Sequence, residues 1–128
     1  MFEQSKAYPS FAVKDVAEAK AFYERLGVKA ESMMGGYVMD LALPGGDTHA
    51  MVYQKDDHRP ATFTVLNFPV DDVDAAVDGL VGAGIEMARF EGFEQDDKGI
   101  SRQGEGPTIA WFRDPSGNIL AVHSNEDM

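Results

Sequence analysis

The chain repeats part of itself 57 residues further along, from Phe11 to Phe68, and this repeat limits the folds it can adopt. Six residues of the segment 11–28 return unchanged in one gapless register, and Val28 returns as Ile85. The identical pairs are Phe11 and Phe68, Val13 and Val70, Asp15 and Asp72, Val16 and Val73, Ala19 and Ala76, and Gly27 and Gly84. Each copy has the pattern of a strand, a helix and further strands, and is too short to bury a core alone. The repeat therefore predicts two paired modules, with any ligand bound where the modules meet.

Length and composition favour a single domain over residues 1–128, which is near the usual size of one folding unit. The chain has no cysteine, which excludes disulfides and thiolate metal sites. No apolar run reaches the ~20 residues that a membrane span needs, and residues 1–8 lack the pattern of a secretory signal. We therefore expect a cytoplasmic protein without a membrane partner.

The chain is acidic, with 22 Asp and Glu against 11 Lys and Arg and a net charge of −11. Because a negative field repels phosphate, we expect no nucleic-acid partner. Acidity of this kind commonly serves solubility alone. The sharper interpretation is a preference for a cationic or neutral small molecule.

The first half, residues 1–54, has the pattern of one βαβββ module. Asp15 is placed to cap a helix, with Glu18 three residues later as in a capping box, and Gly27 ends that helix. The expected strands are 6–13, 28–33, 37–43 and 49–54. Residues 55–61 are polar, contain Pro60 and form the expected linker between the modules.

The second half, residues 62–128, repeats this pattern, with Asp71 or Asp72 as the helix cap and Gly84 as its end. The expected strands are 62–70, 85–90, 108–113 and 119–123. Residues 92–107 form the longest predicted loop. A lid over the ligand is one interpretation of that loop, and a solvated acidic loop is the more common case. Pro115 and Gly117 predict a tight hairpin turn over 114–118.

Three stretches resemble the vicinal oxygen chelate superfamily, the group of glyoxalases, bleomycin-resistance proteins and extradiol dioxygenases. They are Phe11-Ala-Val-Lys-Asp15 leading to Phe22-Tyr-Glu-Arg-Leu-Gly27, then Phe68-Pro-Val-Asp-Asp-Val-Asp-Ala-Ala76, and Trp111-Phe-Arg-Asp-Pro-Ser-Gly-Asn118-Ile-Leu. The resemblance implies an α+β fold of two βαβββ modules, whose curved mixed sheets enclose a cleft. It also implies that the protein forms a homodimer.

Metal-dependent members of that superfamily hold His near the start of each module's first strand and a carboxylate on the last strand. The resemblance aligns those positions with Tyr8, Val65 and Ala121, and the segment His49–Tyr53 has no Asp or Glu for the fourth. A divalent ion needs several N or O donors at one point. We therefore expect neither a metal nor another cofactor, although a site built from His49 and His123 remains an alternative.

Strand alternation selects the side chains expected to face the cleft, because Phe11 and Phe68 should pack beneath the helices and their neighbours should point the other way. The expected ligand-binding residues are Tyr8, Ser10, Phe63, Val65, Asn67, Ile109, Trp111, Ala121 and His123. An aromatic, mostly apolar lining of this kind is typical of small-molecule sites. Ordinary core packing of Trp111 and Tyr8 is the alternative.

We interpret the chain as a metal-independent binding protein of the bleomycin-resistance type that sequesters a cationic or aromatic ligand. The alternative is a glyoxalase-like lyase or isomerase, or a dioxygenase-type enzyme, with a non-standard metal site or with Tyr8, His123 or Asp40 as acid or base. A third interpretation is an accessory domain that acts through its dimer surface. The residues do not identify the ligand.

We predict that the purified protein, freed of any affinity tag, holds no stoichiometric divalent metal, because apolar side chains replace most of the donors. Elemental analysis checks this directly. One tightly held divalent ion per chain would contradict it.

Overall fold

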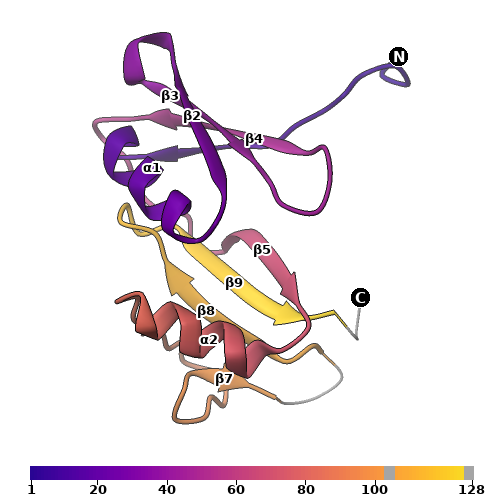
Figure 1. Ribbon diagram of the computed structural model, residues 1–128, viewed down its shortest axis with the longest axis vertical. Coiled ribbons are helices and arrows are strands. Elements are labelled where there is room, and N and C mark those ends of the chain that lie inside the picture. Colours follow the sequence, from indigo (N-terminus) through magenta and orange to yellow (C-terminus); the bar gives the residue numbers. More distant parts are fainter. Residues whose placement is uncertain (103–105, 126–128) are drawn as a thin grey trace. The chain divides into compact units, whose positions relative to one another are not determined.

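The computed structural model describes residues 1–102 and 106–125 (Figure 1). The chain divides into two compact units, Met1–Arg59 and Pro60–Met128. This division falls inside the expected linker 55–61. The expectation that the two units make one domain stays a prediction.

The first unit is a βαβββ module. Its elements are β1 (Ser10–Val13), α1 (Val16–Arg25), β2 (Lys29–Met33), the short 3₁₀ turn η1 (Met34–Gly36), β3 (Val38–Ala42) and β4 (His49–Gln54). The strands form one sheet in the order β1-β4-β3-β2, in which β1 runs parallel to β4 and the other pairs are antiparallel. The strand expected over 6–13 is shorter than predicted, because pairing with β4 begins only at Ser10.

The second unit repeats this topology. Its elements are β5 (Thr64–Val70), α2 (Val73–Gly82), β6 (Met87–Ala88), β7 (Ile100–Ser101), β8 (Ile109–Arg113) and β9 (Ile119–Ser124). The order is β5-β9-β8-β6, with β7 also paired to β8, and β5 is parallel to β9 as β1 is to β4. The α+β fold of two βαβββ modules with mixed sheets is confirmed.

The strands β6 and β7 are two pieces of one interrupted strand. Their partners on β8 follow one another without a gap: Met87 with Phe112, Ala88 with Trp111, Ile100 with Ala110, and Ser101 with Ile109. Residues 89–99 are thus a loop inserted into a strand that resumes in register. The strand predicted over 85–90 is wrong at both ends, and the predicted irregular segment 92–107 contains β7. Part of that segment, residues 103–105, lies outside the described residues.

Both helices begin and end at the repeated positions. Asp15 Oδ1 accepts a hydrogen bond from the Glu18 N–H at 3.0 Å, and Asp72 Oδ1 accepts one from the Ala75 N–H at 3.0 Å. Of the two alternatives for the second cap, Asp72 is the residue that serves. Gly27 and Gly84 both follow their helices at φ +86, a left-handed conformation that costs glycine little.

Each helix lies across one face of its own sheet and leaves the other face without a helix (Figure 1). The side chains that α1 buries are Val16, Ala19, Phe22 and Tyr23, and those of α2 are Val73, Val77 and Leu80. Phe11 meets the Tyr23 ring edge-on at 6.2 Å, as its strand parity predicts. Within the described residues, neither ten-residue helix has the length and apolarity of a membrane span.

We predict that Asp72→Ala lowers the free energy of unfolding by about 1 kcal/mol, because the Ala75 N–H loses its acceptor. Asp72→Asn keeps a side-chain oxygen at the cap and should cost much less. Urea unfolding followed by far-ultraviolet circular dichroism measures both. Equal losses for the two variants would assign the effect to charge and not to the cap.

Candidate functional site

Five of the expected ligand-binding residues share one face of the second sheet. Asn67, Ala121, Trp111 and Ala88 lie opposite one another in a single row across β5, β9, β8 and β6. His123 and Ile109 are opposite each other in the next row. Strand alternation puts Phe112 and Leu120 on the other face, which α2 covers. The candidate site is therefore the helix-free face of this sheet.

The centre of this face is closed, and its border is open. Trp111 is 7% exposed and His123 5%, and Ala121 is fully buried. Asn67 is exposed, Phe63 precedes β5 with 66% of its surface exposed, and Val65 is half-buried. A hydrophobic cluster joins Ala88, Trp111, Ile119 and Ala121, with Phe90 and Ile109 packed against it. Trp111 thus has the expected face together with the burial of a core residue.

Two phenylalanines of the inserted loop 89–99 cover Trp111. The Phe90 ring meets the indole edge-on, with centroids 5.6 Å apart, and the Phe93 ring lies tilted at 56° and 4.8 Å from it. The guanidinium of Arg113 stands 5.1 Å from the centre of the Phe90 ring, within cation–π range. Sequence reasoning missed Phe90 and Phe93. The available signal was a pair of aromatic residues in an otherwise polar, glycine-containing loop.

The side chain of Gln95 closes the base of this loop. Its Oε1 accepts from the Phe90 N–H at 2.9 Å, and its Nε2 donates to the carbonyls of Ala88 at 2.9 Å and Gly99 at 2.8 Å. These carbonyls lie where β6 ends and just before β7 begins. One amide therefore holds together the two points where the strand is interrupted.

Asp96 is the second anchor of the loop. Its Oδ1 accepts from the Lys98 and Ile100 N–H groups, both at 2.9 Å. The hydrogen bond from the Ile100 N–H is the largest influence on the pKa of Asp96 and lowers it. Desolvation comes second and raises the pKa, and the contacts with Lys98 and Arg102 lower it further. Arg102 also reaches Asp74 of α2 at 2.8 Å, so the loop base is tied to the helix.

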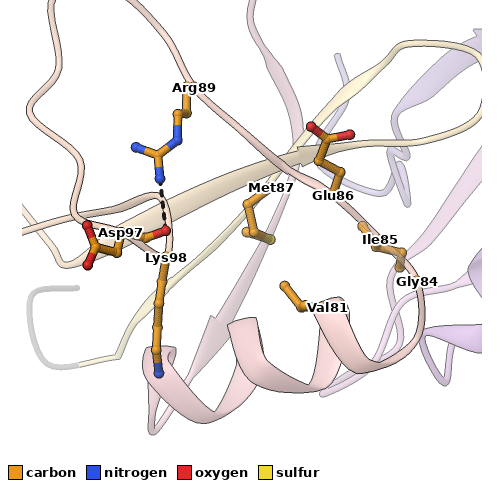
Figure 2. A pocket seen from close by; sticks show the side chains of 8 residues that line it. All are labelled: Val81, Gly84, Ile85, Glu86, Met87, Arg89, Asp97 and Lys98. Atoms are coloured by element: carbon orange, nitrogen blue, oxygen red, sulfur yellow. Dashed lines mark hydrogen bonds between the residues drawn. The ribbon is translucent and has the colours of Figure 1, made fainter.

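A hollow of about 490 Å³ lies on the helix side of the loop (Figure 2). It is lined by Val81, Gly84, Ile85, Glu86, Met87, Arg89, Asp97 and Lys98. Figure 2 shows Met87 and Val81 pointing toward each other from the strand and the helix. The cations of its border already have partners, because Arg89 Nη2 donates to the Asp97 carbonyl at 2.9 Å and Lys98 Nζ lies 3.0 Å from Asp78. None of the expected site residues lines this hollow.

The imidazole of His123 is held in one orientation. Its Nδ1 lies 3.0 Å from the carbonyl oxygen of Ser124. Because a carbonyl only accepts, Nδ1 carries a proton, and Nε2 is the ring nitrogen left to serve as an acceptor. Trp111 is a diagonal neighbour on the same face. His123 therefore places a hydrogen-bond acceptor near the indole, on a side chain that is 5% exposed.

The other expected site residues lie in the first unit. Tyr8 precedes β1 with 60% of its surface exposed, and Ser10 opens β1, exposed and opposite Met51. Asp40 Oδ2 lies 2.8 Å from His49 Nδ1. This pair borders a hollow of about 430 Å³, lined by Glu24, Lys29, Ala30, Glu31, Asp40, Ala42 and His49. Sequence reasoning missed the partnership of Asp40 and His49, because it depends on the register between β3 and β4.

The family follows from a sequence match to most of the chain. The model of the Glyoxalase/Bleomycin resistance protein/Dioxygenase superfamily matches residues 7–122. The chain belongs to this superfamily. A comparison with curated protein sequences gave no significant match.

Solved structures of the superfamily share the fold. The bleomycin resistance determinant encoded on transposon Tn5 is 25% identical, with 95% of this chain and 98% of that chain covered and a TM-score of 0.69. A superfamily member from Sphaerobacter thermophilus is 20% identical, with 95% and 99% covered and a TM-score of 0.70. An antibiotic binding protein from Streptomyces sp. CB03234 is 22% identical, with 93% and 95% covered and a TM-score of 0.66.

The residues at the superfamily's metal positions do not fit a divalent ion. Ser10 pairs with Met51 in the first unit, as its repeat Asn67 pairs with Ala121 in the second. The structural repeat therefore makes Met51 the fourth metal position, in addition to Tyr8, Val65 and Ala121. These side chains offer one phenol, one thioether and aliphatic groups, where oxygen and nitrogen donors are needed. Over residues 1–102 and 106–125, no three His, Asp or Glu side chains gather in an arrangement that could hold an ion.

We predict that the cover over Trp111 loosens in acid. The pKa of Asp96 is lowered from 3.8 in the folded protein. The ionised group therefore stabilises the loop above that value, and this contribution is lost as the pH falls through the lowered pKa. Quenching of Trp111 fluorescence by acrylamide, measured against pH, should rise before far-ultraviolet circular dichroism reports unfolding.

Asp96→Asn is the control for the acid transition. It keeps an oxygen acceptor for the Lys98 and Ile100 N–H groups but has no titratable charge. This variant should lack the early rise in quenching. An identical pH profile in wild type and Asp96→Asn would refute the assignment to Asp96.

Proposed function

We propose that the protein binds a small cationic or aromatic molecule, without a metal, on the helix-free face of the second sheet. The observation that carries this proposal is the row of Asn67, Ala121 and Trp111 with His123 beside it. The row combines an indole for stacking, a small residue at the centre and two polar side chains able to orient a ligand. Fixed polar groups around an apolar surface are what a small-molecule site requires.

Charge and family support the same function. The net charge of −11 attracts a cationic ligand from solution and repels an anionic one. The Tn5 protein, 25% identical along nearly its whole length, is by its description a determinant of bleomycin resistance. Sequestration of an organic molecule needs no nucleophile and no metal, and the residues at the superfamily's metal positions suit that role.

An enzyme is the second candidate, favoured by one specific observation. Asp40 and His49 form a carboxylate–imidazole pair at 2.8 Å. A carboxylate on Nδ1 fixes the tautomer and leaves Nε2 as a base, the arrangement used in general acid–base catalysis. Turnover of a candidate substrate that disappears in both His49→Gln and Asp40→Asn would favour this function over binding.

A homodimer and a cytoplasmic location complete the proposal. The strands β1 and β2 are the edges of the first sheet, and β5 is an edge of the second. Exposed edges are an association hazard that a second copy can cover. Sedimentation that shows only the monomer at roughly tens of micromolar protein would count against the dimer, because a weak dimer forms only when the protomer concentration is high enough.

We predict that Trp111→Ala weakens the binding of 9-aminoacridine, a flat cationic probe, by about tenfold, equivalent to about 1.4 kcal/mol. Isothermal titration measures the dissociation constant. Trp111→Phe keeps an aromatic ring and most of the packing, and should retain most of the affinity. In wild type, the probe should also change the fluorescence of Trp111, the single tryptophan of the chain.

Urea unfolding supplies the control for that prediction, with Phe112→Ala as the reference, because Phe112 is 1% exposed and lies on the face that α2 covers. Truncation of a buried aromatic side chain costs about 3–5 kcal/mol. Trp111→Ala should cost less stability than Phe112→Ala. If Trp111→Ala is as destabilising as Phe112→Ala and 9-aminoacridine leaves the Trp111 fluorescence of wild type unchanged, Trp111 is a core residue and the proposed face is wrong.

A further inference from the structure

Access to Trp111 is the difficulty that the proposed site has to solve. The indole is 7% exposed, so no ligand ring can stack on it while its present neighbours stay in place. Those neighbours from loop 89–99 are Phe90 and Phe93. A ligand that uses Trp111 must displace at least one of these two rings.

Phe93 is the ring able to leave. It is 55% exposed, whereas Phe90 is half-buried, has its N–H bonded to Gln95 and lies beneath the guanidinium of Arg113. The residue before Phe93 is Gly92, which has φ +89, a left-handed conformation that favours glycine. The loop can therefore turn sharply just before the Phe93 ring.

The hydrogen bonds that anchor the loop join residues before and after Phe93 in the sequence, and Phe93 is not one of their partners. Gln95 binds the carbonyls of Ala88 and Gly99, and Asp96 binds the Ile100 N–H. These bonds fix the loop at its base, whichever position the Phe93 ring takes. Movement of this ring requires no change in the pairing of β6 or β7 with β8.

We infer that Phe93 is a removable cover of Trp111, and that it selects ligands with a flat, positively charged aromatic ring. The inference rests on the proposed function, and it names the ligand class. A flat ring recovers the contact with the indole that is lost when Phe93 leaves, and an aliphatic cation does not. The carboxylates of Glu91 and Glu94 flank Phe93 in the sequence, and both residues are exposed, which favours a positive charge on the incoming ring.

The first arm of the test uses the protein without any ligand. Acrylamide quenching of Trp111 fluorescence is measured in wild type, Phe93→Ala, Phe90→Ala and Phe2→Ala, in which Phe2 is an exposed phenylalanine of the first unit. Phe93→Ala should raise the quenching constant roughly twofold or more, because it removes one of the two rings that cover the indole. Its circular dichroism should be unchanged. Phe2→Ala should leave the quenching constant unchanged. No rise in Phe93→Ala would overturn the cover.

The second arm measures binding of 9-aminoacridine (flat and cationic), acridone (flat and neutral) and spermidine (cationic without a ring). Because the probe no longer displaces a ring, Phe93→Ala should bind 9-aminoacridine about three- to tenfold more tightly, with faster association. Acridone should bind more weakly, and spermidine should leave Trp111 fluorescence unchanged. Phe90→Ala serves as the matched ring deletion and should not speed association.

The outcomes separate the cover from the proposed function. If 9-aminoacridine binds through Trp111 but Phe93→Ala weakens binding, Phe93 is a fixed wall of the site, and the cover is wrong while the function stands. If Phe93→Ala exposes Trp111 and none of the three probes binds to either protein, the ligand class and the proposed function both fail. Equal affinity for 9-aminoacridine and spermidine would overturn the selection of flat rings.

Discussion

The parallel pairing of the first and last strands of each module is the constraint on which the rest of the structure depends. β1 pairs with β4, and β5 with β9, at equivalent registers. Parallel neighbours cannot be joined by a tight turn, so the intervening chain must cross the sheet, and a helix makes that crossing on one face. The opposite face is left for side chains that need not pack against a helix. The candidate site of the second unit occupies such a face, and its residues come from strands rather than from helix ends.

Local chemistry explains why much of this fold could be predicted from the sequence. Asp15 and Asp72 cap helices because a carboxylate oxygen one residue before a helix meets its free N–H groups. Gly27 and Gly84 end them because their φ of +86 favours glycine. The shared face of Asn67, Trp111 and Ala121 follows from the two-residue period of a strand together with the order of the strands. Each of these inferences needs only neighbours in the sequence or the repeat.

The inserted loop and the Asp40–His49 pair could not be predicted in the same way. The strand can be interrupted after Ala88 because Ile100 pairs with the next residue of β8, and this pairing joins segments that are distant in the sequence. The burial of Trp111 depends on the positions of Phe90 and Phe93. A loop has no regular alternation of side chains, so the sequence does not predict these positions. The contact of Asp40 with His49 requires the register of β3 on β4. The missing information was a long-range register in the first and third cases, and the conformation of a loop in the second.

The interruption of the strand allows the sequence of residues 89–99 to vary without loss of the sheet. Ala88 and Ile100 face consecutive residues of β8, so a chain without residues 89–99 would still offer β8 an edge partner in the same register. The length and composition of this segment are therefore decoupled from the pairing of the sheet. A loop of different length or sequence can replace this one and place other side chains over the indole. The packing of α2 and the three longer strands need not change. The second unit thus separates the strands and the helix that form its core from the loop that we propose selects the ligand.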